Sequence, residues 1–194
     1  MAIIDLIRHG EPEGGRRYRG ATDDPLTAEG WRQMEAAVAR KADWQRIYTS
    51  PLARCRDFAR VLAARLAVPV QEDARLQELG YGVWEGLTPE ELRRQDPGQL
   101  DRFFSNPLAH QPTGAEPLAD FQRRVLAGWA DILRRSGDER VLVVAHAGTL
   151  RAVLGHVLGM PLEHIFRINI GYAAMIRIRS EGARPPALVI EGVA

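Results

Sequence analysis

Short apolar runs alternate along the chain with longer stretches in which apolar residues recur at every third or fourth position. The runs at residues 2–8 and 140–146 are almost continuously apolar, and the second is rich in β-branched residues. Such runs are typical of strands that are buried on both faces of a sheet. Weaker patterns predict further strands at 46–50, 68–73, 173–180 and 186–192.

The stretches between these strands predict helices. Thr27 is the expected N-cap of a helix that extends to residue 42. A second helix is predicted over 50–66, with Ser50 as its N-cap and Pro51 in the first helical position. Both predictions rest on side chains that suit the unpaired N–H groups of a first helical turn.

Three more helices are expected in the second half of the chain. Thr88 and Glu91 have the spacing of a capping box that begins one of them. Pro117 can begin a long helix that ends near Gly137, and the last helix covers 148–159. The long helix is expected to bury Leu118, Phe121, Val125, Ile132 and Leu133.

The alternation of strands with helices predicts an α/β protein, a three-layer sandwich whose mostly parallel central sheet is covered by helices on both faces. The chain has 194 residues, a length that suits one domain. We find no internal repeat, low-complexity tract or linker-like change of composition. Residues 1–194 are therefore expected to form a single domain.

Composition narrows the classes of function. The formal net charge is +1, so the molecule lacks the positive field of a nucleic-acid-binding protein. The single cysteine, Cys55, excludes an intramolecular disulfide and fits a reducing cytosol. The N-terminus has no basic segment typical of a signal peptide, and no run approaches the roughly 20 apolar residues of a membrane span. We expect a soluble cytoplasmic protein without nucleic-acid or membrane partners, and a homodimer stays open.

Two predicted strands end in histidine. Arg8 and His9 follow the first strand, and His146 closes the strand at 140–146. The strand at 46–50 leads into a helix whose first turn holds Arg54, an unfavourable place for a cation unless an anion is bound there. Sites in open α/β sheets form beyond the carboxyl ends of the strands. We therefore expect these four side chains to converge on one anion, and arginine forks suit phosphate.

Four stretches of the chain together resemble the sequence blocks of a known enzyme family. These are LIRHGEPEGG…RGATDDPLTAEG, YTSPLARC, LQELGYGVWEGLT and VVAHAGTLRAV. In this order they are similar to the blocks of the histidine phosphatase (phosphoglycerate mutase-like) superfamily, and they cover most of the chain. The resemblance implies a phosphoglycerate mutase-like sandwich and a phosphoric monoester hydrolase that acts on a small phosphorylated metabolite.

The resemblance implies a role for each of five residues. His9 matches the histidine that attacks phosphorus and becomes phosphohistidine. Arg8 and Arg54 match the arginines that hold the phosphoryl oxygens, and His146 matches the histidine that donates a hydrogen bond to the same group. Glu78 matches the carboxyl group that protonates the leaving oxygen.

These roles agree with the chemistry of the side chains. An imidazole attacks phosphorus only when it is neutral, so His9 needs an orienting hydrogen bond at its other nitrogen. Two arginines and a second histidine can spread the transition-state charge, so no metal or other cofactor is expected. An alkoxide is a poor leaving group, so Glu78 must supply a proton. Glu72, in a predicted strand, and Glu85, taken as loop structure, are its competitors.

Other residues of the matching blocks are less specific. Arg16, Arg17 and Arg19 lie in the loop after the nucleophile, where they form either a solvated run of charge or a contact with a second anionic part of the substrate. Arg17, Gly20 and Ala147 complete the predicted substrate-binding and phosphate-binding residues. The stretch around Glu116 departs from the family's usual Gly-Gly-Glu-Ser at Ala115 and Pro117, so a role for Glu116 stays open.

Three other classes of protein fit the sequence less well. A metallohydrolase would want clusters such as H-E-x-x-H, and the sequence has none. A cysteine-dependent phosphatase needs an arginine six residues after its cysteine, whereas Cys55 is followed there by Val61. A binding protein that has lost catalysis should lack one of the five residues above, and this chain has them all.

Within the superfamily, the sequence favours a phosphatase over a mutase. The mutases have a longer segment between the acid and the second histidine, for which 78–146 leaves little room. The block RHGEPEGGRRYRGATDDPLTAEGW most resembles bacterial α-ribazole phosphatases of late cobalamin synthesis. A phosphatase of other small phosphomonoesters is the alternative, and a cofactor-dependent phosphoglycerate mutase is the least favoured.

Overall fold

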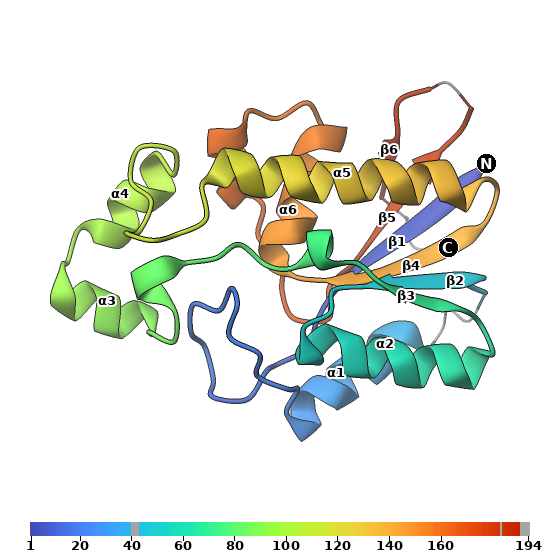
Figure 1. Ribbon diagram of the computed structural model, residues 1–194, viewed down its shortest axis with the longest axis horizontal. Coiled ribbons are helices and arrows are strands. Elements are labelled where there is room, and N and C mark those ends of the chain that lie inside the picture. Colours follow the sequence, from blue (N-terminus) through green and yellow to red (C-terminus); the bar gives the residue numbers. More distant parts are fainter. Residues whose placement is uncertain (40–42, 183, 191–194) are drawn as a thin grey trace.

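The computed structural model describes residues 1–39, 43–182 and 184–190. Within this part of the chain six strands form one sheet in the order β3-β2-β4-β1-β5-β6 (Figure 1). The ladders among β3, β2, β4 and β1 are parallel, whereas β5 pairs antiparallel with β1 and with β6. The strands are β1 (Ala2–Arg8), β2 (Arg46–Thr49), β3 (Val70–Glu72), β4 (Arg140–Ala145), β5 (Met175–Ser180) and β6 (Ala187–Val189).

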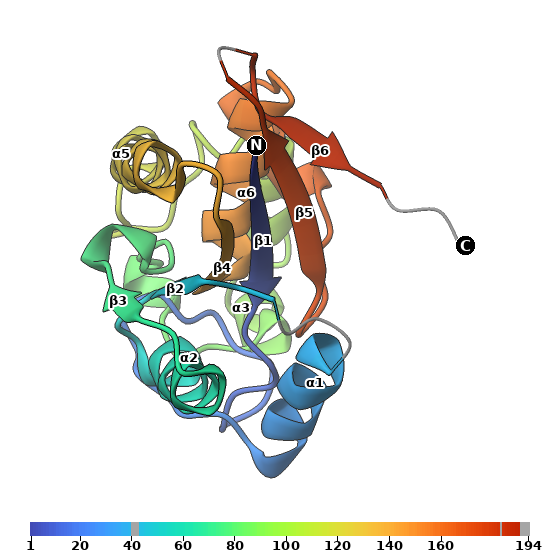
Figure 2. The same ribbon diagram turned by 90° about the vertical axis from the view of Figure 1, so that its right-hand side faces the viewer.

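Helices cover both faces of this sheet. The helices are α1 (Ala28–Val38), α2 (Ala53–Leu66), α3 (Pro89–Gln95), α4 (Gln99–Ser105), α5 (Leu118–Ser136) and α6 (Ala147–Val157), with short 3₁₀ turns η1 (Ala74–Leu76), η2 (Gly82–Trp84) and η3 (Leu162–Arg167). Figure 2 shows α1 and α2 on one side of the sheet and α5 and α6 on the other. The predicted three-layer sandwich with a mostly parallel sheet is confirmed.

The central strand β4 illustrates why both faces are covered. Its alternate side chains enter different cores, Val141 and Val143 toward α5 and α6, and Leu142 and Val144 toward α1 and α2. A strand that is apolar on both faces must bury both, because each fully buried aliphatic side chain stabilises the fold by about 1.5–3 kcal/mol. No helix in the described ranges is both long and apolar enough to cross a bilayer.

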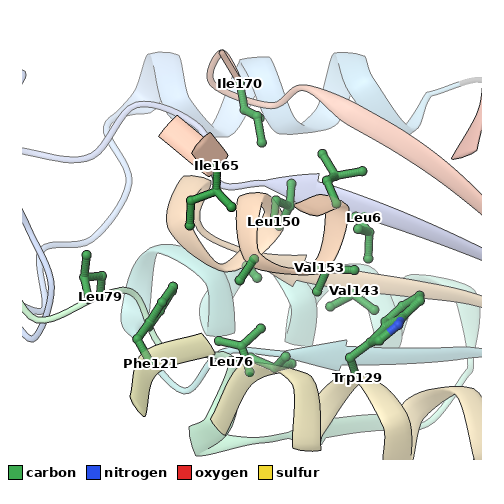
Figure 3. Close-up of a cluster of buried hydrophobic side chains, with 14 of the residues drawn as sticks. Leu6, Leu76, Leu79, Phe121, Trp129, Val143, Leu150, Val153, Ile165 and Ile170 are labelled. Carbon is green, nitrogen blue, oxygen red and sulfur yellow. The ribbon is translucent and has the colours of Figure 1, made fainter. Parts of the chain in front are cut away.

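The larger core fixes α6 against the sheet. Figure 3 shows Leu150 and Val153 of α6 packed among side chains of β1, β4 and α5, with Trp129 of α5 and Val143 of β4 at one end. These side chains are at most 3% exposed. The packing holds the N-terminus of α6 at the carboxyl edge of the sheet, next to the end of β1.

The sequence names a cap or first residue for four of the five predicted helices, and the structure agrees at three of these four. Thr27 accepts a hydrogen bond from the N–H of Gly30 as the N-cap of α1. Thr88 and Glu91 form the predicted capping box of α3, and α5 begins directly after Pro117. The predicted ends of α1 at 40–42 and of the last strand at 191–192 lie outside the described residues.

The prediction that Ser50 is the N-cap of the second helix, with Pro51 in its first turn, is wrong. Helix α2 begins at Ala53, and the N–H of Ala53 donates instead to Asp23 of the loop after β1, at 2.5 Å. The Ser50 hydroxyl oxygen lies 2.7 Å from Nε2 of His146. Ser50 thus contacts His146 instead of capping α2, and the carboxylate of Asp23 accepts the hydrogen bond at the N-terminus of this helix.

Helix α4 has no counterpart among the predicted helices. It follows Gly98 and has no side-chain cap, so its local sequence carries little helix signal. It is stabilised by Phe103, whose ring centre lies 5.3 Å from that of Trp84 and 4.9 Å from that of Phe166. The helix therefore depends on tertiary packing of one buried face.

Candidate active site

The parallel strands bring their carboxyl ends together at one edge of the sheet. The N–H of His9 donates to the carbonyl oxygen of Ala145 at 3.0 Å, and the N–H of Ser50 donates to Val144 at 3.0 Å. These bonds continue the ladders by one residue beyond β1 and β2. The ring centres of His9 and His146 lie 5.3 Å apart. The two histidines that the sequence places at strand ends are thus neighbours.

His9 is held in one tautomer. Its Nδ1 lies 2.7 Å from the carbonyl oxygen of Gly10, which can only accept, so Nδ1 carries the proton and Nε2 keeps a free lone pair. Burial, with the Arg54 and Arg8 guanidinium groups, lowers the pKa of His9 well below its ordinary value. The imidazole is therefore neutral near pH 7, the form in which Nε2 can act as a nucleophile.

His146 is also neutral and fully buried. Burial, followed by the charge of Arg54, lowers its pKa well below the ordinary value. The hydroxyl of Ser50 fixes Nε2, and Sγ of Cys55 lies 3.7 Å from the same nitrogen. Burial raises the pKa of the Cys55 thiol, which therefore stays protonated. A buried thiol of this kind is a packing group, not a nucleophile.

Two guanidinium groups in this site lack a carboxylate partner in the described part of the chain. Nη1 of Arg8 donates to the carbonyl of Ile170 at 2.6 Å. Arg54 is 1% exposed and donates to the carbonyls of Thr22, at 2.6 Å, and Gly20, at 3.3 Å. The Nε atom of each arginine is buried without a hydrogen-bond partner. Buried cations without a counter-ion are costly, so both favour a bound anion.

Glu78 is the carboxylate of this site. Its Oε1 accepts from the N–H of Leu79 and its Oε2 accepts from the N–H of Gly148, each at 3.0 Å. Gly148 is the second residue of α6, and a Cβ there would lie 2.2 Å from Oε1 of Glu78. The glycine therefore permits the close approach of Glu78 to the N-terminus of α6.

Arg124 of α5 holds the backbone around Glu78. Its two terminal nitrogens donate to the carbonyls of Gln77 and Glu78, both at 2.9 Å. Its Nε donates to Oε1 of Glu116 at 2.6 Å and its Nη2 to Oε2 at 2.7 Å. The role of Glu116 that the sequence leaves open is thus to orient Arg124. The helical pattern gave no signal for Arg124, because arginine on a long helix is ordinarily solvated.

The competing carboxylates are engaged elsewhere. Glu85 accepts from the N–H of Gly20 at 2.8 Å, from the N–H of Tyr81 at 2.9 Å and from the hydroxyl of Thr22 at 2.9 Å. Glu72 forms an ion pair with Arg60, at 2.5 Å, at the edge of the sheet. Glu85 therefore joins two loops, in agreement with its interpretation as loop structure.

A cavity of about 230 Å³ opens above these groups. Its inner end is lined by Arg8, His9, Glu78 and Ala147, whereas Arg54 and His146 are buried and do not line it. Ala147 is the first residue of α6, where backbone N–H groups have no helical acceptor. The inner end therefore presents N–H donors, the Arg8 cation and a neutral imidazole, and the buried Arg54 cation also lowers the pKa of that imidazole. This set suits a phosphoryl group.

The remaining predicted binding residues differ in position. The N–H of Gly20 is already bonded to Glu85, and a Cβ at this position would lie 2.3 Å from the carbonyl oxygen of Leu79, so Gly20 packs loops together. Arg17 lines the cavity but donates to the carbonyls of Gly14 and Gly86. Arg19 is buried and pairs with Asp24.

Several residues that line or support the cavity were not predicted from the sequence. Tyr172 stacks against Arg8, and Arg151 lines the cavity from α6. Tyr172 lies in an irregular segment before β5, and Arg151 sits within a helical pattern, so neither position had a distinguishing signal. Across residues 1–39, 43–182 and 184–190, no group of three or more His, Cys, Asp or Glu side chains is placed to hold a metal ion.

Comparison with protein families matches residues 4–191 to the histidine phosphatase superfamily (branch 1). The chain is similar to a bifunctional protein of Mycobacterium tuberculosis, with 34% identity over 175 residues that cover 88% of this chain and 48% of that protein. It thus spans about half the length of the first curated relatives that it matches.

Other relatives match over most of their length. Phosphoserine phosphatase 1 of Hydrogenobacter thermophilus is 28% identical, with 95% of this chain and 89% of the relative covered. A probable phosphoglycerate mutase of Klebsiella pneumoniae subsp. pneumoniae is 31% identical, with 92% and 85% covered. The solved α-ribazole phosphatase of Shigella flexneri superposes with a TM-score of 0.83 at 24% identity, over 97% of this chain and 95% of that one.

Proposed function

The chain belongs to the histidine phosphatase superfamily, and we propose that it hydrolyses small phosphomonoesters through a phosphohistidine formed on His9. The observation that carries this proposal is a neutral His9 with a free Nε2, whose pKa is lowered by burial and by two guanidinium groups that have no carboxylate partner in the described residues. Together with burial, Arg54 and Arg8 lower the pKa of His9, which keeps the nucleophile uncharged. The same two cations can neutralise the negative charge of a bound phosphoryl group.

The reaction follows from these positions in two steps. The phosphoryl group binds to Arg8, Arg54 and the N-terminus of α6, and Nε2 of His9 attacks phosphorus as the bond to the leaving oxygen breaks. Glu78 gives its proton to that oxygen, so the product leaves as an alcohol. Water then attacks the phosphohistidine and gives a proton to Glu78, which releases inorganic phosphate and restores both groups.

Trapping the intermediate tests this mechanism. Protein quenched during turnover of a radiolabelled phosphomonoester should carry a label that is labile to acid and stable to alkali, as a phosphoramidate is. His9→Ala should remove the label and all turnover, whereas His110→Ala, at an exposed histidine outside the cavity, should keep both. A label that survives acid, or one that persists in His9→Ala, contradicts the proposal.

We further propose α-ribazole 5′-phosphate of cobalamin synthesis as one candidate substrate. The resemblance of the loop after His9 to α-ribazole phosphatases supports it, and so do Tyr18, Phe104 and Phe166, flat side chains of the cavity against which a planar base can stack. Esters with other leaving groups, such as phosphoserine, are the alternative. Relative kcat/KM values across a panel of phosphorylated metabolites decide between them.

A mutase is the less favoured activity. The segment between Glu78 and His146 contributes only Tyr81 and residues of the short helices α3 and α4 to the cavity lining. We expect so small a cover to leave the cavity accessible to water. Release of inorganic phosphate from 3-phosphoglycerate is therefore expected, without interconversion of the 2- and 3-phosphate esters. Interconversion without phosphate release contradicts the phosphatase assignment.

A further inference from the structure

The cavity holds more positive charge than a phosphoryl group requires. Five arginines line it: Arg8, Arg16, Arg17, Arg19 and Arg151. Glu78 is the one carboxylate that lines it within the described ranges, and His9 is neutral. Arg8 lies at the phosphoryl end beside His9, and the charge of buried Arg54 also acts on His9. The other four arginines surround the space that a leaving group would fill.

Two of these four arginines, Arg17 and Arg19, already have hydrogen-bond or ion-pair partners within the protein. Arg19 is buried and pairs with Asp24 at 2.5 Å. Arg17 donates to two backbone carbonyls and lies 3.8 Å from Glu91. Their charges and donors are used to hold the loop after β1 in place.

Arg16 and Arg151 have guanidinium N–H groups that are not used in hydrogen bonds within the described residues. Arg16 has no hydrogen bond or ion pair within the described residues. Arg151 uses Nε for the carbonyl of Ile168 at 2.8 Å and lies over the Phe166 ring at 5.6 Å, which leaves both terminal nitrogens without an acceptor in that part of the chain. A guanidinium held at one edge with its fork free is arranged to bind an oxyanion.

Arg16 and Arg151 line the same cavity from different elements. Arg151 is four residues after Ala147 on α6, so both lie on one helix face, with Arg151 farther from the phosphoryl end. Arg16 lies in the loop after β1, two residues before Tyr18. Arg16, Tyr18 and Arg151 all line the cavity, and the charges of both arginines oppose the rise that burial causes in the pKa of the Tyr18 hydroxyl.

We propose that Arg16 and Arg151 form a second anion-binding subsite, and that the substrate is a phosphomonoester whose leaving group carries a carboxylate or a second phosphoryl group. The proposal rests on the proposed function, because it takes the inner end of the cavity as the phosphoryl site. The carbon skeleton of the substrate then lies between the two anionic ends, against Tyr18 and Phe166.

A second anion-binding subsite would distinguish the candidate substrates by the charge of their leaving groups. The leaving group of α-ribazole 5′-phosphate is uncharged and would leave both guanidinium groups without an anion. Phosphorylated hydroxy acids and sugar bisphosphates would satisfy them. The second subsite thus favours a doubly anionic ester over the neutral nucleoside.

Matched pairs of esters test the subsite. 3-Phosphoglycerate and glycerol 3-phosphate differ only by a carboxylate in place of a hydroxymethyl group, and glucose 1,6-bisphosphate and glucose 6-phosphate differ by one phosphoryl group. We expect one pair to show at least about tenfold higher kcat/KM for the more anionic member in the wild type, since a charged hydrogen bond contributes about 1.5–3 kcal/mol. The pair with the larger ratio identifies the second anion as carboxylate or phosphoryl.

Variants assign the preference to residues. Arg16→Gln and Arg151→Gln should each reduce the ratio within that pair about tenfold. Arg93→Gln is the matched control, because Arg93 also acts by its charge on Tyr18 but pairs with Glu90 outside the cavity lining, and it should keep the wild-type ratio. Arg16 has no structural hydrogen bond to lose, so it decides the matter if Arg151→Gln fails to fold.

A binding measurement separates this inference from the proposed function. Calorimetric Kd values on His9→Ala protein should show the same preference without turnover. Wild-type hydrolysis with ratios near one for both pairs overturns the subsite and leaves the phosphatase standing. A Kd preference without any wild-type turnover overturns the phosphatase and leaves the subsite standing. A preference that survives in Arg16→Gln and Arg151→Gln also overturns the subsite.

Discussion

The guanidinium carbon of Arg8 lies 4.2 Å from the centre of the Tyr172 ring. The same ring centre is 6.0 Å from that of His9, and the Arg8 fork is held at its other side by the carbonyl of Ile170. Tyr172 therefore supports the cation that faces the nucleophile. A flat ring against a flat guanidinium restricts its rotation and contributes about 0.5–2 kcal/mol.

Truncation of Tyr172 should weaken the phosphoryl site as a whole. We expect Tyr172→Ala to lower kcat/KM about tenfold, and by the same factor for alkyl and nitrophenyl phosphates, because in the proposed mechanism Arg8 binds the phosphoryl group that all esters share. Tyr172→Phe retains the ring and should stay within about threefold of the wild type. Steady-state kinetics on both substrates measure this, and a loss confined to one leaving group would assign Tyr172 to the outer cavity.

The leaving group should separate Glu78 from Glu85. A nitrophenolate leaves without a proton, whereas an alkoxide needs one, so Glu78→Gln should lower hydrolysis of glycerol 3-phosphate by about 10²–10⁴-fold and of nitrophenyl phosphate much less. Glu85→Gln loses acceptors for two loops and should lower the Tm without this dependence. The opposite pattern in the two variants would show that the acid has been misassigned.

Arg54 should not tolerate lysine. Its fork donates to the carbonyls of Thr22 and Gly20 while its Nε stays free, and an ammonium group provides no such planar set of donors. We expect Arg54→Lys to lose about 10²-fold or more in kcat/KM, as when one oxyanion donor is removed. Arg56→Lys, in the same helix but paired with Asp57, is the control and should be near wild type.

Acid should destabilise the protein through its two buried histidines. Burial lowers the pKa of His9 and His146 well below 6.5. Below about pH 6.5 these two histidines therefore become protonated in the unfolded chain but stay neutral in the folded chain. Stability from these groups is constant above that pH and falls as the pH decreases toward their lowered pKa values. The Tm of His146→Gln should therefore fall less steeply between pH 7 and 5 than that of the wild type or of His110→Gln. Parallel slopes in all three proteins contradict the prediction.

Chelation should leave activity intact. In the proposed mechanism Arg8 and Arg54 oppose the charge of the phosphoryl group, and the described residues contain no cluster of three or more potential metal ligands. Exhaustive dialysis against EDTA should therefore change kcat by less than about twofold. Loss of activity that a divalent ion restores would require a different mechanism.

The central part of the site could be predicted because it lies where regular strands end. Continuous apolar runs identify β1 and β4, and the residues after a parallel strand have one fixed place at the edge of the sheet. Arg8, His9 and His146 follow directly from that rule. Glu78 came from resemblance, since it lies in the irregular segment between η1 and η2, which has no periodic pattern.

The parts that escaped prediction depend on contacts between distant segments. Ser50 looks like a local cap, but His146 offers its side chain a partner across the sheet. Arg124 and Tyr172 act on residues that are 46 and 164 positions away in the chain, which no local spacing reveals. Helix α4 follows the same rule, because the tertiary packing of its buried Leu100 and Phe103 explains it.

The two ends of the cavity come from different parts of the chain. The phosphoryl end belongs to strand exits locked into the sheet, whereas the outer wall comes from the loop at Arg16, from α4 and from η3, of which α4 lies well away from the sheet (Figure 1). Insertions or substitutions in those outer segments can accumulate without moving His9 or Arg54. Enzymes that descend from one ancestor can therefore change their substrate specificity while they keep the same catalytic residues. Redesign of the substrate specificity of this protein can begin at α4.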